Sequence, residues 1–231
     1  MIYAAILAGG KGTRFGSDTP KQFLKLGRET ILQLSAKQFI EHEGIGSVYI
    51  AVPEQYLDQT RAVFKQKKVT VISGGNSRNA SLKNIVEHIT ASGKILVSDI
   101  ILTHDAARPF VTRRIIDDNI TALDHYDGAG TAIPVTDTIY DTYNDTVAYV
   151  RNRDLMQAAQ TPQSFNLKKL SAALSVSGRE LAEYTDTCGL FLKGGINYVK
   201  AVKGDPTNIK ITTPIDYDLA KVIYKGLKNA P

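Results

Sequence analysis

A glycine-rich turn followed by two cations lies near the beginning of the chain. Residues 7–16 read Leu-Ala-Gly-Gly-Lys-Gly-Thr-Arg-Phe-Gly, so Arg14 lies inside the turn and Lys21 follows shortly after it. Glycines let backbone N–H groups approach an anion closely, while an arginine offers paired donors and a lysine offers a mobile charge. The glycine spacing matches neither the P-loop nor the dinucleotide-binding pattern. The segment predicts a triphosphate-binding loop, with a simple tight turn as the alternative.

A second glycine pair precedes a segment with helical spacing. Residues 74–81 read Gly-Gly-Asn-Ser-Arg-Asn-Ala-Ser. Small residues with polar caps would let a base or a ribose rest against the backbone. The same string also suits an ordinary turn and helix N-cap, so both interpretations stay open.

An aspartate follows the strand that we expect at the centre of the sheet. Residues 103–110 read Thr-His-Asp-Ala-Ala-Arg-Pro-Phe, which places Asp105 at the carboxyl end of that strand. Ligands gather at such strand ends in open α/β sheets, and a carboxylate is a hard oxygen ligand for Mg²⁺. Asp105 is therefore a candidate metal ligand. His104 beside it is better explained as a buried structural hydrogen-bonding group.

Polar residues in three later segments are further candidates. The first comprises Thr138 and Arg153, the second is Gln-Thr-Pro-Gln-Ser-Phe at 160–165, and the third is Lys-Gly-Asp-Pro-Thr-Asn-Ile-Lys at 203–210. We expect the third to be a loop leading into a short strand. Ordinary surface polarity is the alternative for each segment, because a lone arginine or lysine is usually solvated.

The elements that must position these residues follow an alternating pattern. Short β-branched runs predict strands, and the amphipathic stretches between them predict helices. This alternation is typical of an α/β fold with a mostly parallel sheet. The expected strands are 2–7, 48–52, 69–72, 100–103 and 131–135, and the expected helices are 31–40, 56–67, 78–89, 113–123 and a closing helix at 214–223.

One segment departs from that pattern. Between Tyr140 and Met156, two polar, tyrosine-containing runs flank a turn at Asn144-Asp145, which predicts a projecting β-hairpin. An isolated two-stranded ribbon is marginally stable and exposes its edges. We therefore expect the hairpin to pair with its copy in a second subunit.

Composition narrows the class of protein. A chain of 231 residues that is 43% hydrophobic and 22% charged suits one domain, 1–231, with an arm at about 139–159. The lone Cys188 cannot form an intramolecular disulfide. The net charge of +5 is spread along the chain, which favours phosphates over nucleic acid as partners. The lack of a possible disulfide favours the cytoplasm. The apolar residues 1–7 are far too few to cross a membrane, so we expect no membrane partner.

Taken together, these segments resemble the cytidylyltransferases that act on methylerythritol 4-phosphate or on ribitol 5-phosphate. The resemblance spans nearly the whole chain, and its most specific strings are His-Asp-Ala-Ala-Arg-Pro at 104–109 and Gln-Thr-Pro-Gln at 160–163. It implies a doubly wound, glycosyltransferase-A-like nucleotidyltransferase fold. It also implies CTP as the donor, a small alditol phosphate as the acceptor, Mg²⁺ as the cofactor and a homodimer whose arm carries Arg153 to the other subunit.

The resemblance assigns roles to individual residues. Arg14, Lys21 and Lys210 are the implied catalytic residues that stabilise the α-phosphate, and Asp105 is the implied metal ligand. Arg78 lies in a string similar to the family's cytidine-binding segment. The implied nucleotide-binding residues are Leu7, Ala8, Gly9, Gly10, Gly12, Gly75, Asn76 and Ser81, and the implied acceptor-binding residues are Ala107, Arg108, Thr138, Arg153 and Thr161.

The two branches of the family differ in their acceptor. The strings at 7–10, 78–79, 163–166 and 185–188 are similar to the ribitol-phosphate branch, whereas those at 105–108, 130–135 and 158–160 are closer to the methylerythritol branch. This comparison favours D-ribitol 5-phosphate, giving CDP-ribitol for teichoic acid or polysaccharide synthesis. The alternatives are 2-C-methyl-D-erythritol 4-phosphate in isoprenoid biosynthesis, a UTP- or ATP-dependent relative, and a non-catalytic nucleotide-binding protein.

Overall fold

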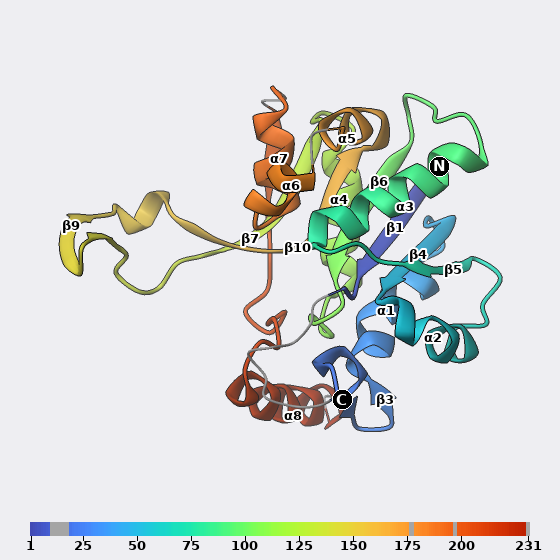
Figure 1. Ribbon diagram of the computed structural model, residues 1–231. Helices are drawn as coiled ribbons and strands as arrows, with labels where there is room; N and C mark the ends of the chain where they lie inside the picture. The colour runs from blue at the N-terminus through green and yellow to red at the C-terminus, as the bar shows by residue number, and fades with distance from the viewer. Residues whose placement is uncertain (10–18, 176–177, 196–197, 230–231) are drawn as a thin grey trace.

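The protein is built around one central β-sheet, which the computed structural model describes over residues 1–9, 19–175, 178–195 and 198–229. In these ranges seven strands pair in the order β11-β7-β10-β6-β1-β4-β5 (Figure 1). Strand β10 runs antiparallel to both of its neighbours, and the other pairs are parallel. The mostly parallel sheet is therefore confirmed, with β6 at its centre. The strands are β1 Ile2–Leu7, β4 Ser47–Val52, β5 Val69–Ser73, β6 Ile100–Asp105, β7 Gly128–Pro134, β10 Gln157–Asn166 and β11 Val199–Lys203.

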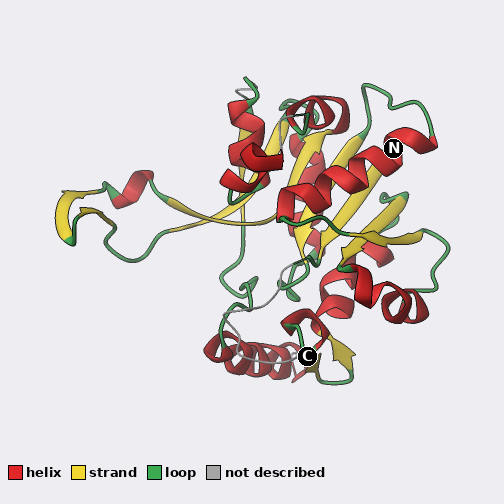
Figure 2. Ribbon diagram, in the orientation of Figure 1, coloured by secondary structure: helices red, strands yellow, loops and turns green. Residues whose placement is uncertain are grey.

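Helices cover both faces of this sheet (Figure 2). Phe39 and Ile115 belong to the core on one face, whereas Leu82 and Phe191 belong to the core on the other. This two-sided covering confirms the doubly wound arrangement. None of the described helices is long and apolar enough to cross a membrane. The first face carries α1 Ile31–Glu41, α2 Leu57–Val63 and α4 Arg113–Ala122, and the second carries α3 Arg78–Ser92, α5 Leu167–Ala173, α6 Gly178–Glu183 and α7 Thr187–Lys193.

The sequence of β1 explains why it lies in the middle of the molecule. Ala4 and Ile6 belong to the core beneath α1, whereas Ala5 and Leu7 belong to the core beneath α3. Successive strand residues point to opposite faces of a sheet, so a strand covered on both faces needs an uninterrupted apolar run. Burial of a side chain such as Ile6 stabilises the fold by roughly 1.5–3 kcal/mol.

A third apolar cluster joins the end of the chain to the segment after the first loop. Leu26, Ile31 and Ala220 are buried together where α8 (Pro214–Asn229) packs against the short strands β2 (Lys25–Leu26) and β3 (Glu29–Thr30). The phenolic hydroxyl of Tyr217 on α8 donates to the carbonyl of Lys25. The 3₁₀ turn η2 (Lys21–Phe23) lies near the first turn of α8, where the charge of Lys21 acts on Asp216.

Strands β8 (Tyr140–Tyr143) and β9 (Thr146–Val150) form a separate antiparallel hairpin. Asn144 and Asp145 between them have φ values of 46° and 59°. Two consecutive left-handed residues of this type are characteristic of the type I′ turn, whose twist suits a two-residue hairpin. The hairpin projects away from the sheet (Figure 1), and every residue of β9 is exposed. Its pairing with a second subunit stays a prediction.

Strands β10 and β11 and helices α5, α6 and α7 were not among the expected elements, and two of the expected elements differ in the structure. The helix expected over 56–67 is shorter: the 3₁₀ turn η3 (Glu54–Tyr56) precedes α2, and Phe64 leaves the helix in an extended conformation. Phe64 is buried in the core, so the chain turns inwards there. The strand expected after residue 203 instead precedes it as β11, and residues 204–213 contain no strand. Asp205 accepts from the N–H of Thr207 in that loop, a local turn that competes with strand pairing.

Candidate active site

Asp105 lies at the carboxyl end of β6 and has three cations around its carboxylate. Arg78 Nε lies 2.8 Å from Oδ1, and Lys210 Nζ lies 2.8 Å from Oδ2. Arg108 Nε is 4.0 Å from Oδ2. The segments after β1, β5 and β6 leave the sheet at one edge, because parallel strands share their carboxyl ends. The structure thus brings the predicted residues Asp105, Arg108 and Lys210 together.

The carboxylate of Asp105 is permanently charged near neutral pH. Only 7% of Asp105 is exposed. Burial alone would raise the pKa of Asp105, but the charges and hydrogen bonds of Arg78 and Lys210 outweigh it and hold this pKa well below its usual range. Asp105 is therefore a fixed negative centre that orders the cations around it.

His104 belongs to a hydrogen-bond chain behind Asp105. Its Nε2 lies 3.0 Å from the carbonyl oxygen of Arg108, which can only accept, so Nε2 carries the proton. Its Nδ1 then accepts from the hydroxyl of Thr161 at 3.0 Å, and Thr161 Oγ1 accepts from the N–H of Asp105 at 3.1 Å. Burial lowers the pKa of His104 to about 4, so the ring is neutral near pH 7. This supports the structural interpretation of His104, and it engages the Thr161 hydroxyl within the protein.

Arg108 is turned into the protein, where it braces the loop that carries Lys210. Its Nη1 donates to the carbonyl of Asn208 at 2.8 Å, and its Nη2 donates to the carbonyl of Ala159 at 3.2 Å. Arg108 is 8% exposed, and Ala107 beside it is 6% exposed. In this arrangement both residues, which the resemblance placed at the acceptor, hold the site's framework.

Gly9, Gly75 and Ser81 meet where β1 ends. A Cβ atom on Gly9 would lie 2.8 Å from Ser81 Oγ, and one on Gly75 would lie 2.7 Å from the Cβ of Ala80. Ser81 Oγ accepts from the N–H of Gly75 at 3.0 Å. Glycine is therefore required at both positions by close approach, and the two predicted nucleotide-binding loops lie against one another. Asn76 is exposed beside them.

Lys21 is held beside this edge through its neighbour Gln22. The buried Gln22 side chain donates from Nε2 to the carbonyl of Ala8 at 2.8 Å, directly after Leu7 ends β1. Burial alone would raise the pKa of Asp216 in α8, but the N–H groups of residues 212 and 213 and the charge of Lys21 together lower it. The predicted residues Gly10, Gly12 and Arg14 lie outside the described residues.

Thr138 and Arg153 are not joined to Asp105 within one chain. Both are exposed and lie between β7 and β10, in the segment that carries the projecting hairpin. Arg153, in the 3₁₀ turn η4 (Arg153–Leu155), donates from Nη1 to the carbonyl of Thr136 at 2.9 Å.

Two residues at the centre, Arg78 and Thr187, were given no role of their own from the sequence, although Arg78 lies in the string that resembles the cytidine-binding segment. Arg78 begins α3 directly after its cap Ser77. A cation in the first turn opposes the helix dipole, so this position was a detectable signal of an anionic partner. Thr187 gave no such signal, because it looks like an ordinary helix start after the cap Asp186.

The donor set fits a Mg²⁺ ion that arrives with a nucleotide. No group of three or more His, Cys, Asp or Glu side chains gathers in the described part of the chain. Magnesium is commonly held by one or two carboxylates together with substrate phosphates, and Asp105 supplies one carboxylate. Both of its oxygens already accept from cations, so a metal on Asp105 would compete with Arg78 and Lys210 for the carboxylate.

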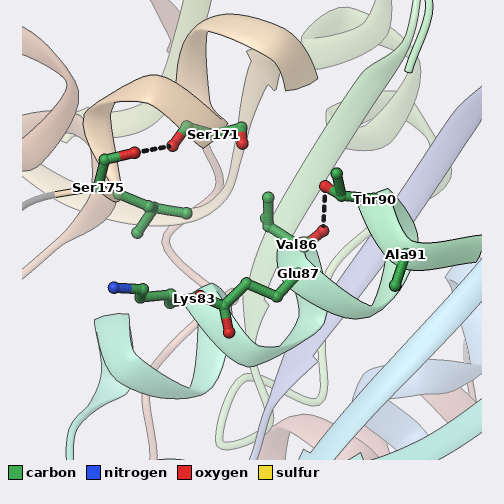
Figure 3. Close-up of a pocket in the computed structure, with 8 residues that line it drawn as sticks. Lys83, Val86, Glu87, Thr90, Ala91, Ser171 and Ser175 are labelled. Carbon is green, nitrogen blue, oxygen red and sulfur yellow. Dashed lines mark hydrogen bonds between the residues drawn. The ribbon is translucent and has the colours of Figure 1, made fainter. Parts of the chain in front are cut away.

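A pocket of about 500 Å³ lies between α3 and α5, apart from this centre (Figure 3). Its Thr90 and Ser175 hydroxyls donate to the carbonyls of Val86 and Ser171, four residues before each. No predicted site residue lines it. These two hydroxyls are therefore engaged within the fold, and the predicted site residues gather at the strand-end cluster instead.

Comparisons with known proteins agree on one family. The family model described as IspD, 2-C-methyl-D-erythritol 4-phosphate cytidylyltransferase, matches residues 2–226. The solved structure of that cytidylyltransferase from Francisella tularensis is 29% identical, with a TM-score of 0.82 over 96% of this chain and 99% of that one. The cytidylyltransferase from Thermus thermophilus is 28% identical, with a TM-score of 0.75 over 96% and 98%. The 4-diphosphocytidyl-2C-methyl-D-erythritol synthase from Anaerococcus prevotii is 25% identical, with a TM-score of 0.82 over 97% and 96%.

The expectation of ribitol 5-phosphate as the acceptor, with its link to teichoic acid or polysaccharide synthesis, is wrong. The family model and the solved structures name methylerythritol-phosphate enzymes instead. Several residues in the strings that suggested ribitol serve the fold: Phe165 packs on Phe191, Asn166 caps α5, and the Asn79 amide donates to backbone carbonyls. Residues of this kind are explained by packing within the fold, so they do not indicate which acceptor the protein uses. The chain belongs to the IspD family, the 2-C-methyl-D-erythritol 4-phosphate cytidylyltransferases, and is a CTP-dependent nucleotidyltransferase.

Proposed function

We propose that the protein transfers the cytidylyl group of CTP to the phosphate of 2-C-methyl-D-erythritol 4-phosphate, in isoprenoid biosynthesis. The observation that carries this proposal is the family match over 2–226, combined with the cluster of Arg78, Arg108 and Lys210 around Asp105. An anionic nucleotide and an anionic acceptor both suit a strand edge with this excess of positive charge.

In the proposed reaction an oxygen of the acceptor phosphate attacks the α-phosphorus of CTP. A new oxygen–phosphorus bond forms, the bond from the α-phosphorus to the bridging oxygen breaks, and pyrophosphate leaves with that electron pair. A phosphate monoester has a second pKa near about 6, so the nucleophile is already largely a dianion at neutral pH. The reaction therefore needs no general base. His104 suits this account, because both of its ring nitrogens are engaged within the protein.

The cations provide the catalysis by alignment and charge neutralisation. Lys210, whose side chain is 43% exposed, can swing from Asp105 to a phosphate oxygen. Lys21 and Arg14 approach the triphosphate from the first loop in this proposal. Gly9, Gly75 and the rest of the predicted nucleotide-binding residues would contact the nucleoside through their backbone.

Enzymes of this family depend generally on a divalent metal ion, and we propose Mg²⁺ for this chain. Asp105 would hold it in exchange for its contact with Lys210. The ion would supply charge neutralisation on the triphosphate when bound. The residues of the chain would bind and orient both substrates.

The acceptor is proposed to contact Thr138 and Arg153, with Arg153 supplied by the arm of a second subunit. The buried Thr161 would support the acceptor site through its hydrogen bond with the N–H of Asp105. A homodimer would then have two composite sites related by a two-fold axis. The absence of nucleic-acid and membrane partners and the cytoplasmic location remain predictions.

The test measures pyrophosphate release by the purified protein with Mg²⁺. CTP, UTP and ATP are each paired with methylerythritol 4-phosphate, erythritol 4-phosphate and ribitol 5-phosphate. We expect the highest kcat/KM for CTP with methylerythritol 4-phosphate. A higher value for another acceptor would overturn the acceptor assignment, and a higher value for another nucleotide would overturn the donor.

A further inference from the structure

The guanidinium of Arg78 is held at two separate points. Its Nε donates to Asp105 Oδ1 at 2.8 Å, and its Nη1 donates to Thr187 Oγ1 at 2.6 Å, with a longer contact of 3.5 Å from Nη1 to Asn79 Oδ1. The third nitrogen, Nη2, is shielded from solvent and has no hydrogen-bond partner among the described residues. The side chain as a whole is 19% exposed, so its accessible part lies elsewhere than Nη2. An unmatched donor on a charged group is costly, so this geometry of the guanidinium depends on the contacts that hold its other two nitrogens.

The hydroxyl of Thr187 has a defined direction. Thr103 Oγ1 lies 3.2 Å from the carbonyl of Gln163, which can only accept, so Thr103 donates there. Thr187 Oγ1 lies 3.4 Å from Thr103 Oγ1 and donates to it, because its own lone pairs face Arg78. The chain of donors therefore runs from Arg78 through Thr187 and Thr103 to β10. It leaves Thr187 as an acceptor for the guanidinium.

Thr187 is itself rigidly placed. It is fully buried, and its N–H donates to Gln163 Oε1 at 3.1 Å. Gln163 Nε2 donates to Asp186 Oδ2 at 2.8 Å, and Asp186 Oδ1 caps α7 through the N–H of Gly189 at 2.8 Å. Side chain and backbone of Thr187 are thus tied to the antiparallel strand β10. A rigidly held Thr187 keeps the guanidinium of Arg78, which it contacts, in a fixed orientation.

We propose that Thr187 is a positioning residue for nucleotide binding, because it fixes the plane of the Arg78 guanidinium beside Asp105, at the strand edge where CTP would bind. The identity of the nucleotide rests on the proposed function. Asp105 alone holds only Nε, about which the guanidinium can tilt. The second contact, from the opposite end of the group, removes that freedom. Thr187 touches no substrate in this proposal and acts through Arg78.

The test is the affinity of the full-length protein for CTP, measured by calorimetry without acceptor. Thr187→Val keeps the shape and removes the hydroxyl, and Thr187→Ser keeps the hydroxyl. Thr60→Val is the matched control. Thr60 lies in α2, is also buried, and donates from its hydroxyl to the carbonyl of Tyr56. We expect Kd for CTP to rise roughly tenfold or more in Thr187→Val, the scale of a lost hydrogen bond to a charged group. The Thr187→Ser and Thr60→Val variants should keep the wild-type Kd.

Steady-state kinetics separate positioning from a structural role. Loss of uniform nucleotide binding raises KM for CTP while kcat and KM for the acceptor stay near wild type. An unchanged Kd and KM for CTP in a folded Thr187→Val protein would overturn the proposal, and so would equal changes in Thr60→Val. If Thr187→Val does not fold, Thr187→Ala replaces it with the same expected result. Failure of the wild type to bind CTP would instead refute the proposed function.

Discussion

Lys210 donates to Asp105 across a 2.8 Å contact in which the lysine side chain is 43% exposed and the aspartate side chain is 10% exposed. Lys210 comes from the loop that follows β11, whereas Asp105 is the last residue of β6. The buried partner also keeps Arg78 as a second cation, so its charge stays matched when Lys210 moves away. A mobile lysine beside a fixed carboxylate is suited to exchange between the protein and a phosphate.

Replacement of Lys210 by alanine should lower kcat by roughly a hundredfold or more, the scale of a lost transition-state charge contact. The fold should persist, because Asp105 retains Arg78. Pyrophosphate release with CTP and methylerythritol 4-phosphate measures the effect. Lys225→Ala, an exposed lysine on α8, is the control and should keep wild-type activity. Similar kcat values for the two variants would show that Lys210 does not act on the reacting phosphate.

Asp105→Asn should abolish Mg²⁺-dependent turnover, because the amide keeps the shape of the side chain and loses the charge. The measurement is activity as a function of Mg²⁺ concentration. Asp118→Asn, in an exposed ion pair with Arg114 on α4, is the matched control. Undiminished activity of the Asp105 variant at low Mg²⁺ would place the metal elsewhere.

Lys21→Ala and Arg14→Ala should each lower kcat by roughly a hundredfold or more if the first loop holds the triphosphate in the transition state. Thermal unfolding of both variants should resemble that of the wild type. Near-normal kcat in both would refute the triphosphate assignment of this loop.

The stability of the protein should fall as the pH drops from about 6.5 towards about 4, partly because of His104. Burial lowers the pKa of His104 from 6.5 to about 4. Between these two pH values, His104 is protonated in the unfolded chain but stays neutral in the folded protein. The contribution of His104 to the free energy of unfolding is complete above pH 6.5 and is lost progressively below it. It amounts to at most about 3 kcal/mol. Urea unfolding at pH 4.5 and 7.5 measures it.

The variant His104→Gln should show a smaller difference in free energy of unfolding between the two pH values than the wild type. Exposed His125 provides the control, and His125→Gln should keep the wild-type difference. Equal differences in all three proteins would mean that His104 titrates normally in the folded state.

Mixing two inactive variants should restore activity if Arg153 acts in the neighbouring subunit. Arg153→Ala removes the arginine that each subunit contributes to the active site of its neighbour. Lys21→Ala removes the lysine that each subunit contributes to its own active site, so neither homodimer has a complete site. Random exchange makes about half of the dimers mixed, each with one intact site, which restores about a quarter of the wild-type sites. No recovery after verified subunit exchange would contradict the shared site.

The sequence by itself determined most elements of the first half of the chain, the hairpin and the closing helix, because local patterns encode them, whereas β10 and helices α5, α6 and α7 were not predicted. The apolar run of β1, the left-handed pair Asn144-Asp145 and the glycines at 9 and 75 each reflect a requirement of the nearby backbone. The motif strings were also sufficient to indicate the family. The type of chemistry followed from these strings, since clustered cations and one strand-end aspartate suit phosphate transfer.

Only the tertiary structure decided which side chains meet and in which direction their hydrogen bonds run. The resemblance predicted that Arg108 contacts a substrate. In the structure its guanidinium instead donates to carbonyls of the loop after β11 and of the antiparallel strand β10, and so it points into the protein. Thr187 reads like a helix start, yet the order of strands in the sheet places it beside Arg78. The physical reason is that contacts between distant segments depend on strand order and orientation, whereas a sequence motif specifies only its own backbone and neighbours.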